Sequence, residues 1–194
     1  MHIKTYKTKT TRCRRRCRIL KDIIKPIIVL ASICLVVTTI LACVNSITAP
    51  IIKAAEEKNA ALSRSEVLNE AKSFEKLDIP LPNGVTDIFK GDNHSGYVIM
   101  SQAKGYGGNI KIICGIRSDG SLEKVKTLSH NETSGIGSKV ADNKSAYNQK
   151  YSGKTADNYT DVDTVSGATI SSKAYRKAVG LAFDAFQTAK ETNP

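Results

Sequence analysis

The pattern of apolar and charged positions divides the chain into an apolar stretch near the N-terminus and a mixed part that follows it. Residues 27–44 are eighteen consecutive residues without a charge, and apolar residues continue to Ile51 and Ile52. A lipid bilayer offers backbone groups no hydrogen-bonding partner, so a segment that crosses it must be a helix of roughly 20 mostly apolar residues. The pattern therefore predicts one transmembrane helix, at residues 26–48.

After the span, the pattern changes from helical to extended. Residues 51–74 are rich in Ala, Glu, Lys and Leu without Gly or Pro, which favours helix. Short runs rich in β-branched residues at 97–100, 109–116 and 122–128 lie between turn residues, which predicts three strands. The Asp119-Gly120 pair between the last two runs predicts a tight antiparallel hairpin, because these residues tolerate a positive φ.

The C-terminal stretch returns to helical spacing, whereas residues 136–151 are polar and fit neither pattern. The order helix, strands, helix, without repeated strand-helix-strand units, predicts an α+β fold with an antiparallel sheet and flanking helices. We expect a basic arm at 1–25, the span at 26–48, a helical connector at 49–80 and one extracytoplasmic domain at 81–190. From Ser171 onward, the apolar positions at helical spacing are Tyr175, Ala178, Val179, Ala182 and Phe186.

The positive charge of the chain is concentrated before the span. The net charge is +11, and residues 1–25 carry ten Lys and Arg against one acid, Asp22, so this arm holds +9 and the rest of the chain +2. Positive charge next to a span stays in the cytoplasm, which predicts a cytoplasmic N-terminus and residues 50–194 outside. Arg-rich arms can also bind nucleic acid or anionic lipid, but orientation explains this one, and we expect no nucleic-acid partner.

Two other interpretations of the N-terminal segment are a cleaved signal peptide and a lipoprotein signal. Residues 40–43, Ile-Leu-Ala-Cys, loosely resemble a lipobox, in which Cys43 would carry the lipid. The long basic lead and the apolar residues beyond Cys43 favour a retained anchor instead. We expect a single-pass protein of the bacterial inner membrane.

The cysteines and histidines suggest neither disulfides nor a metal site. Cys114 is the one cysteine of the outer domain, so no disulfide framework is possible there. Cys13 and Cys17 lie in the basic arm, and no nearby Cys or His completes a ligand set with them. The remaining residues of these two types are Cys34, Cys43, His2, His94 and His130, which form no recognisable metal-ligand motif.

The segment 163–172, Asp-Thr-Val-Ser-Gly-Ala-Thr-Ile-Ser-Ser, leads directly into the closing helix. Gly167 and Ala168 allow a backbone to approach a ligand closely, and the start of a helix offers unpaired N–H groups with the positive end of the dipole, which suits a phosphate. On the residues alone, Ser171 or Ser172 could instead simply cap the helix after a turn at Gly167. Both interpretations stay open at this point.

This segment resembles the flavinylation motif of FMN-binding domains, which occur in the G subunit of the Rnf complex and in the C subunit of the sodium-pumping NADH:quinone oxidoreductase. In that family, a flavin transferase takes FAD as donor and joins FMN through its phosphate to the last threonine of the motif. The resemblance implies that Thr169 carries covalent FMN. It implies cofactor-binding roles for Ser166, Gly167, Ala168 and Asp163 as well, although Asp163 could equally be an ordinary turn carboxylate.

Three further segments are similar to the same family. Residues 130–137, His-Asn-Glu-Thr-Ser-Gly-Ile-Gly, resemble its His-x-Glu-Thr-Pro-Gly-Leu-Gly stretch, with Ser134 in place of the proline. Residues 105–110 resemble its Gly-Tyr-x-Gly-x-Ile element, and residues 45–50 are similar too. With four segments in order, the resemblance covers residues 44–186 and favours the G subunit of Rnf. It implies that Glu132 and Thr133 line the flavin site and that Gly135 and Gly137 allow the backbone to approach the flavin ring closely.

The function that the resemblance implies is electron transfer within a membrane-bound, ion-translocating ferredoxin:NAD oxidoreductase complex. Thr169 would anchor the FMN, and no catalytic residue is required. The implied partners are the other membrane subunits, the flavin transferase during maturation and the lipid bilayer. The alternatives are a stand-alone flavin carrier, anchored by the same helix or by a lipid on Cys43, and a non-redox scaffold domain.

Overall fold

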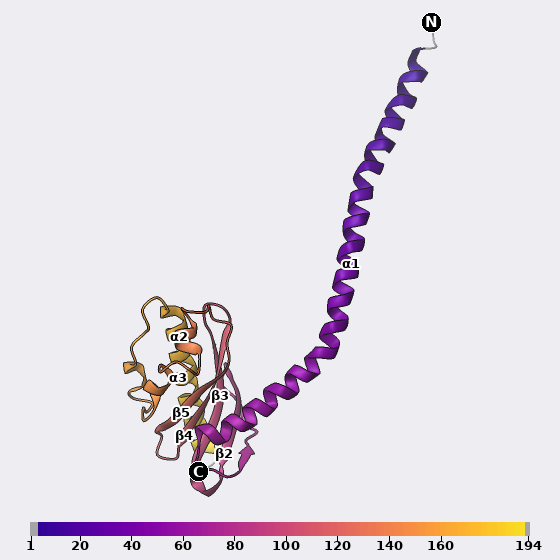
Figure 1. Cartoon of the computed structure of the whole chain (residues 1–194). Helices are drawn as coiled ribbons and strands as arrows, with labels where there is room; N and C mark the ends of the chain where they lie inside the picture. The colour runs from indigo at the N-terminus through magenta and orange to yellow at the C-terminus, as the bar shows by residue number, and fades with distance from the viewer. Residues whose placement is uncertain (1–3, 193–194) are drawn as a thin grey trace. The chain divides into compact units, whose positions relative to one another are not determined.

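The structure is a computed structural model that describes the backbone from Lys4 to Thr192 and the side chains from Ile23 to Thr192. It divides into two units, residues Met1–Ala54 and Ala55–Pro194 (Figure 1). The first unit contains most of helix α1 (Lys4–Val67), and the second contains the end of α1 and every other element. The expectations for the side chains of the basic arm, with those for His2, Cys13 and Cys17, lie outside the described residues.

Helix α1 has the properties that a membrane span requires. Its part from Ile23 onward is the one helix, among the described residues, that is long and apolar enough to cross a membrane, and none of its most apolar window is buried. The hydroxyl groups of its residues 27–48 are satisfied within the helix; for example, Thr38 donates to the carbonyl of Cys34 at 2.8 Å and Thr39 to that of Leu35 at 2.7 Å. Hydroxyls bonded in this way need no water, which is what hydrocarbon demands.

The structure ends the helical connector earlier than the sequence predicts. Helix α1 stops at Val67 instead of Phe74, and strand β1 (Phe74–Lys76) follows within the predicted connector. Beyond the end of the helix, the carboxylate of Asp92 accepts hydrogen bonds from the amides of Lys72 at 2.9 Å and Ser73 at 3.2 Å. These amides therefore bind a side chain some twenty residues away instead of continuing the helix.

Five antiparallel strands form one meandering sheet in the order β1-β2-β3-β4-β5. The three predicted strands are confirmed, with β3 longer at both ends than expected, and β1 and β2 were not predicted. The Asp-Gly hairpin is also confirmed, because Gly120 has a φ of +88° and donates its N–H to the carbonyl of Arg117 at 2.9 Å. The strands after β1 are β2 (Val85–Gly91), β3 (Gly96–Lys104), β4 (Asn109–Arg117) and β5 (Leu122–Ser129).

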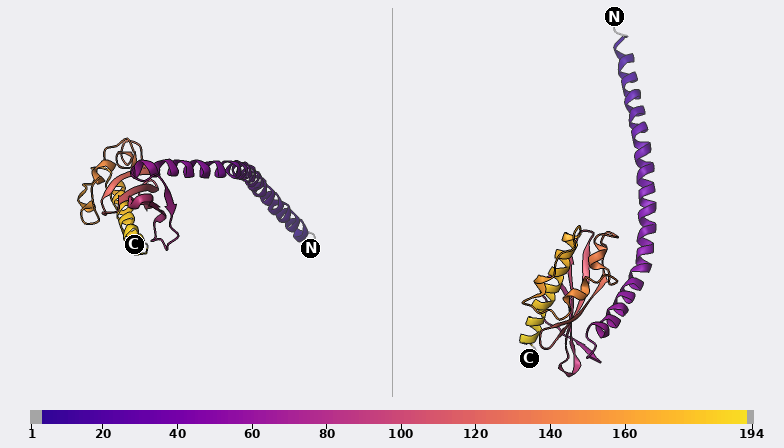
Figure 2. Two further views of the ribbon diagram at one scale, coloured as in Figure 1. Left: turned by 90° about the horizontal axis from the view of Figure 1, so that it is seen from below. Right: turned by 60° about the vertical axis from the view of Figure 1, so that its left-hand side comes forward.

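Helices cover both faces of the sheet, as Figure 2 shows for the long helix α3 (Thr169–Thr192) and the end of α1. Alternate side chains of a strand point to opposite faces. Ile99 and Cys114 belong to the core beneath α3, whereas Val98 and Ile113 pack with the residues that end α1. The predicted α+β class is confirmed, and the sheet is the rigid layer to which both helices are attached.

The ambiguous stretch 136–151 folds against α3 in short pieces, among them α2 (Ser138–Ala141) and the 3-10 turn η2 (Asn148–Tyr151). Tyr147 and Tyr151 pack with Tyr175 of α3, with ring centroids 5.7 to 5.8 Å apart. Burial raises the pKa of Tyr175 and Tyr151, so both phenols stay neutral. This aromatic cluster holds the loops before α3 in place. The other short elements are η1 (Asp92–His94) and η3 (Tyr159–Asp161).

Substituting Gly115 by alanine tests the contact between α1 and the sheet. A Cβ at this position would lie 2.0 Å from the carbonyl oxygen of Val67, so the end of α1 must shift away from β4. We expect Gly115→Ala to lower the free energy of unfolding by about 1–3 kcal/mol, the usual effect of overpacking. Urea unfolding of the full-length protein in detergent, followed by circular dichroism, measures this. An unchanged midpoint would show that α1 does not pack on the sheet as described.

Candidate functional site

The carboxylate of Glu132 joins three loops at one end of the sheet. Glu132 is 8% exposed, and its Oε1 accepts a hydrogen bond from the amide of Gly107 at 3.1 Å. Its Oε2 accepts one from the hydroxyl of Ser171 at 2.5 Å. The turn between β3 and β4, the loop after β5 and the first turn of α3 therefore meet at one side chain. These are the three domain segments that the sequence analysis singled out separately.

Glycines make room for this carboxylate. A Cβ on Gly105 would lie 2.2 Å from Oε1 of Glu132, and one on Gly137 would lie 2.5 Å from Oε2. A side chain at either position would displace the carboxylate from its two donors. In the structure, glycine at position 137 leaves room for the Glu132 carboxylate. The sequence suggested a different role for Gly137, namely close approach of the backbone to a flavin ring.

The turn before α3 is fixed by Ser172. The amide of Ala168 donates to the carbonyl of Val165 at 3.0 Å, and Gly167 adopts a φ of +79°, which favours glycine at this position. The hydroxyl of Ser172 accepts from the amide of Val165 and donates to the carbonyl of Ala168, both at 3.0 Å. Ser172 therefore stands inside the helix and ties the turn to it, instead of preceding the helix as a cap.

Helix α3 begins at Thr169, two residues earlier than the sequence predicted. Thr169 is exposed, and within the described residues its hydroxyl forms no hydrogen bond. The preceding Ala168 is buried and has no side-chain acceptor, so it cannot cap the first amides of the helix. The result is a free hydroxyl at the positive end of a long helix, which is a favourable place for a phosphate.

An exposed apolar side chain projects from each of the three joined segments. Tyr106 is 73% exposed in the β3–β4 turn, Ile136 is 52% exposed in the loop after β5, and Ile170 is 56% exposed next to Thr169. Gly135, beside Ile136, has a φ of +78°, and a Cβ at this position would meet nothing within 4 Å, so this backbone is open to a ligand. This end of the domain thus combines a helix start that favours a phosphate with exposed apolar side chains. These two features suit the phosphate and the ring of FMN.

The remaining predicted site residues lie on the surface of these same segments. Asp163 and Thr133 are exposed, and their side chains form no hydrogen bond with another described residue. Ser166 is exposed in the turn before α3. Sequence reasoning missed Ser171 as a partner of Glu132, and the closely spaced glycines at 105 and 107 were the available signal that a side chain had to fit there.

Comparison with known proteins agrees with this arrangement. The FMN-binding domain family matches residues 105–184, which run from the β3–β4 turn through most of α3. The chain thus contains an FMN-binding domain.

Several known proteins are similar over most of the chain. The G subunit of the proton-translocating ferredoxin:NAD(+) oxidoreductase complex of Clostridium ljungdahlii is 30% identical over 170 residues, 80% of this chain and 86% of the relative. Its Na(+)-translocating counterpart from Acetobacterium woodii is 24% identical over 86% of this chain and 93% of the relative. The G subunit of the ion-translocating oxidoreductase complex of Shewanella amazonensis is 31% identical over 82% and 86%. The chain belongs to this family of G subunits.

Replacing Glu132 tests whether it holds the site together. Glu132→Ala leaves the Gly107 amide and the Ser171 hydroxyl without their acceptor, and we expect a loss of about 2 kcal/mol or more in the free energy of unfolding. Glu132→Gln keeps one acceptor oxygen and should lose less. The matched control is Glu66→Ala, which breaks an exposed ion pair with Lys126 and should change stability by about 0–1 kcal/mol. Equal losses for Glu132→Ala and Glu66→Ala in urea titrations would contradict a central role for Glu132.

Proposed function

We propose that this protein is an electron-transfer subunit of a membrane-bound, ion-translocating ferredoxin:NAD oxidoreductase complex, in which it carries FMN bound covalently through phosphate to Thr169. The observation that carries the proposal is the free, exposed hydroxyl of Thr169 at the start of α3. The similarity to a relative of this kind over four fifths of the chain supports the same function.

Thr169 suits the attachment better than the hydroxyls around it. Ser171 and Ser172 are buried, and their hydroxyls already bond Glu132 and the turn before the helix. Ser166 is exposed but lies in the turn, before the helix begins. A phosphate on Thr169 would be next to the unpaired first amides of α3, which stabilise negative charge.

The chain supplies binding and orientation, and FMN supplies the redox chemistry when it is bound. Ile136 and Ile170 offer apolar surface to the ring, and the open backbone at Gly135 allows close approach. Glu132 positions the three loops that carry these groups. We assign Thr133 to the lining of the site, and Asp163 to positioning the threonine or to the metal used by the flavin transferase.

The same proposal places the protein in the bacterial inner membrane, with α1 as the single span. The charge of +9 before the span favours a cytoplasmic N-terminus and an FMN domain outside. A covalent link is useful there, because a dissociated FMN would be lost and no local pool would replace it. The partners are the other subunits of the complex, the flavin transferase during maturation and the bilayer itself.

Intact mass and in-gel flavin fluorescence of the protein from its native membrane test the attachment. We expect a mass increment of one esterified FMN in the wild type and in Ser166→Ala, and none in Thr169→Ala, because the ester needs the Thr169 hydroxyl. Thr169→Ser keeps a hydroxyl and should retain flavin. An increment that persists in Thr169→Ala would place the attachment elsewhere. A wild type without flavin, from cells that flavinylate other proteins, would favour the scaffold alternative.

Membership of the complex is tested by purification from native membranes with an affinity tag on this chain. Other subunits of the oxidoreductase should co-purify, and NADH-dependent reduction of the bound flavin should require them. If flavinylated protein is recovered alone under conditions that preserve the complex, the stand-alone carrier becomes the better explanation.

Labelling with a membrane-impermeant maleimide tests the orientation of the chain. Two variants are compared: Ala156→Cys, on the exposed surface of the outer domain, and a chain that keeps Cys13 in the arm. The other cysteines are replaced by serine, except Cys114, which is buried and whose pKa burial raises. Intact spheroplasts should label Ala156→Cys at once and Cys13 only after permeabilisation. Labelling of Cys13 in intact spheroplasts would reverse the proposed orientation.

A further inference from the structure

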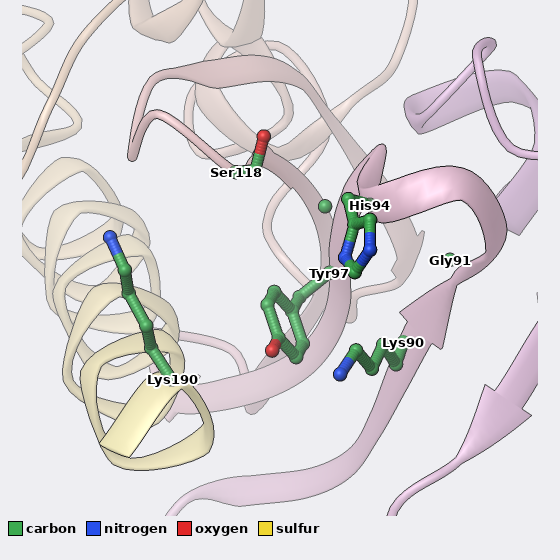
Figure 3. A pocket seen from close by; sticks show the side chains of 7 residues that line it. Lys90, Gly91, His94, Tyr97, Ser118 and Lys190 are labelled. Atoms are coloured by element: carbon green, nitrogen blue, oxygen red, sulfur yellow. The ribbon is translucent and has the colours of Figure 1, made fainter. Parts of the chain in front are cut away.

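A hollow lies at the opposite end of the sheet from Glu132. The turn that brings Gly107 to Glu132 joins the end of β3 to the start of β4. The hollow instead lies where β2 ends and β3 begins, at Gly91 and Gly96, and just past the end of β4, at Ser118. Its volume is about 310 Å³. We call it the lysine pocket, and it is lined by Lys90, Gly91, His94, Gly96, Tyr97, Ser118 and Lys190 (Figure 3).

The lining of the lysine pocket is positively charged and contains no carboxylate. Lys90 comes from β2 and Lys190 from the last turn of α3, and in Figure 3 their side chains lie on either side of the Tyr97 ring. Among the described residues, neither lysine forms an ion pair, although Glu75 stands opposite Lys90 in the β1–β2 ladder. Uncompensated charge in a hollow attracts anions.

Two of the acidic residues next to the pocket in sequence, Asp92 and Asp119, are committed to other contacts, whereas Glu191, beside Lys190, forms no ion pair with a described residue. Asp92 binds the amides of Lys72 and Ser73, and these hydrogen bonds, with the Lys72 amide first, lower its pKa. Asp119 binds the hydroxyl and amide of Ser121 at 2.7 and 2.8 Å. Neither carboxylate neutralises the two lysines.

The walls of the pocket are built by unusual backbone and a packed aromatic ring. Asn93 and His94 both adopt a positive φ, 54° and 55°, which is uncommon outside glycine and sets the direction of the imidazole. A Cβ on Gly96 would lie 2.1 Å from the carbonyl oxygen of Ile116, so β3 can begin here only with glycine. The Tyr97 ring packs edge-to-face on Phe186 at 5.5 Å, which gives the pocket an aromatic floor.

We propose that the lysine pocket binds a small organic anion through a phosphate or carboxylate group. The volume lies at the lower end of the range for small-molecule sites, roughly 300–1,000 Å³. Lys90 and Lys190 supply N–H donors and positive charge, the imidazole of His94 and the hydroxyl of Ser118 supply further donors, and the aromatic floor contacts the body of the ligand. The site is separate from the flavin and does not depend on the proposed function.

Calorimetric titration of the full-length, flavinylated protein in nanodiscs of zwitterionic lipid tests the proposal. The probes are pyrophosphate and citrate, with sodium chloride at equal ionic strength as the control. We expect saturable binding of at least one probe, and an affinity at least about tenfold lower in the Lys90→Gln/Lys190→Gln variant, because two charge-assisted contacts are lost. The matched control is Lys104→Gln/Lys124→Gln, which removes two exposed lysines elsewhere and should bind as the wild type does.

A second variant keeps the test valid if the double lysine variant folds poorly. His94→Asn removes the imidazole, and asparagine tolerates the left-handed backbone at this position. Affinity should fall severalfold while flavin content and the urea midpoint stay unchanged. Tighter binding of pyrophosphate than of citrate would assign the site to phosphates, and the reverse to carboxylates. The proposal is overturned if neither probe binds above the chloride control, or if the control pair of lysines lowers affinity as much as the pocket pair.

Discussion

The buried carboxylate of Glu132 is the interaction on which the functional end of the domain depends. A polar group taken out of water must find partners in the protein, and Glu132 finds the amide of Gly107 and the hydroxyl of Ser171. These donors come from positions 25 before and 39 after it in the chain. Three loops are held in one place as a consequence, and Thr169 owes its position to the same contact because it begins the helix that carries Ser171.

In this domain the sheet forms the scaffold, and the loops at its ends carry the candidate site, as is common for binding sites. The sheet is covered on both faces, so its strands have little freedom to move. The loops at the Glu132 end expose apolar side chains that a folded protein would otherwise bury, namely Tyr106, Ile136 and Ile170. Exposed apolar groups gathered at loops are typical of a surface that a ligand or partner covers.

Helix α3 connects two chemically different ends of the domain. Its first turn presents unpaired amides and the Thr169 hydroxyl, where the helix dipole favours an anion. Its last turn carries Lys190, where the dipole favours a cation, and this lysine lines the pocket at the far end of the sheet. One helix thus places the proposed phosphate position and a basic pocket at opposite ends of the sheet, so that occupation of one would not obstruct the other.

Much of the architecture was predictable from local pattern, whereas tertiary structure decided what depends on contacts between distant residues. The uncharged stretch after the basic arm determines the span, because only a continuous apolar helix satisfies its backbone in lipid. Short runs rich in β-branched residues, with the turn residues between them, located β3, β4, β5 and the Asp119-Gly120 hairpin. The resemblance of four segments identified the family and singled out Thr169, since a short motif is a local property of the chain. Helix propensity, however, continues past Val67, whereas in the structure the amides of Lys72 and Ser73 bind the distant carboxylate of Asp92 and the chain enters β1. The contacts of Glu132 and the lysine pocket likewise join residues that are far apart in sequence.

Periodicity along a chain reports which face of an element is buried, but it carries no information about which distant donor a carboxylate will meet. That choice is made only when the elements pack.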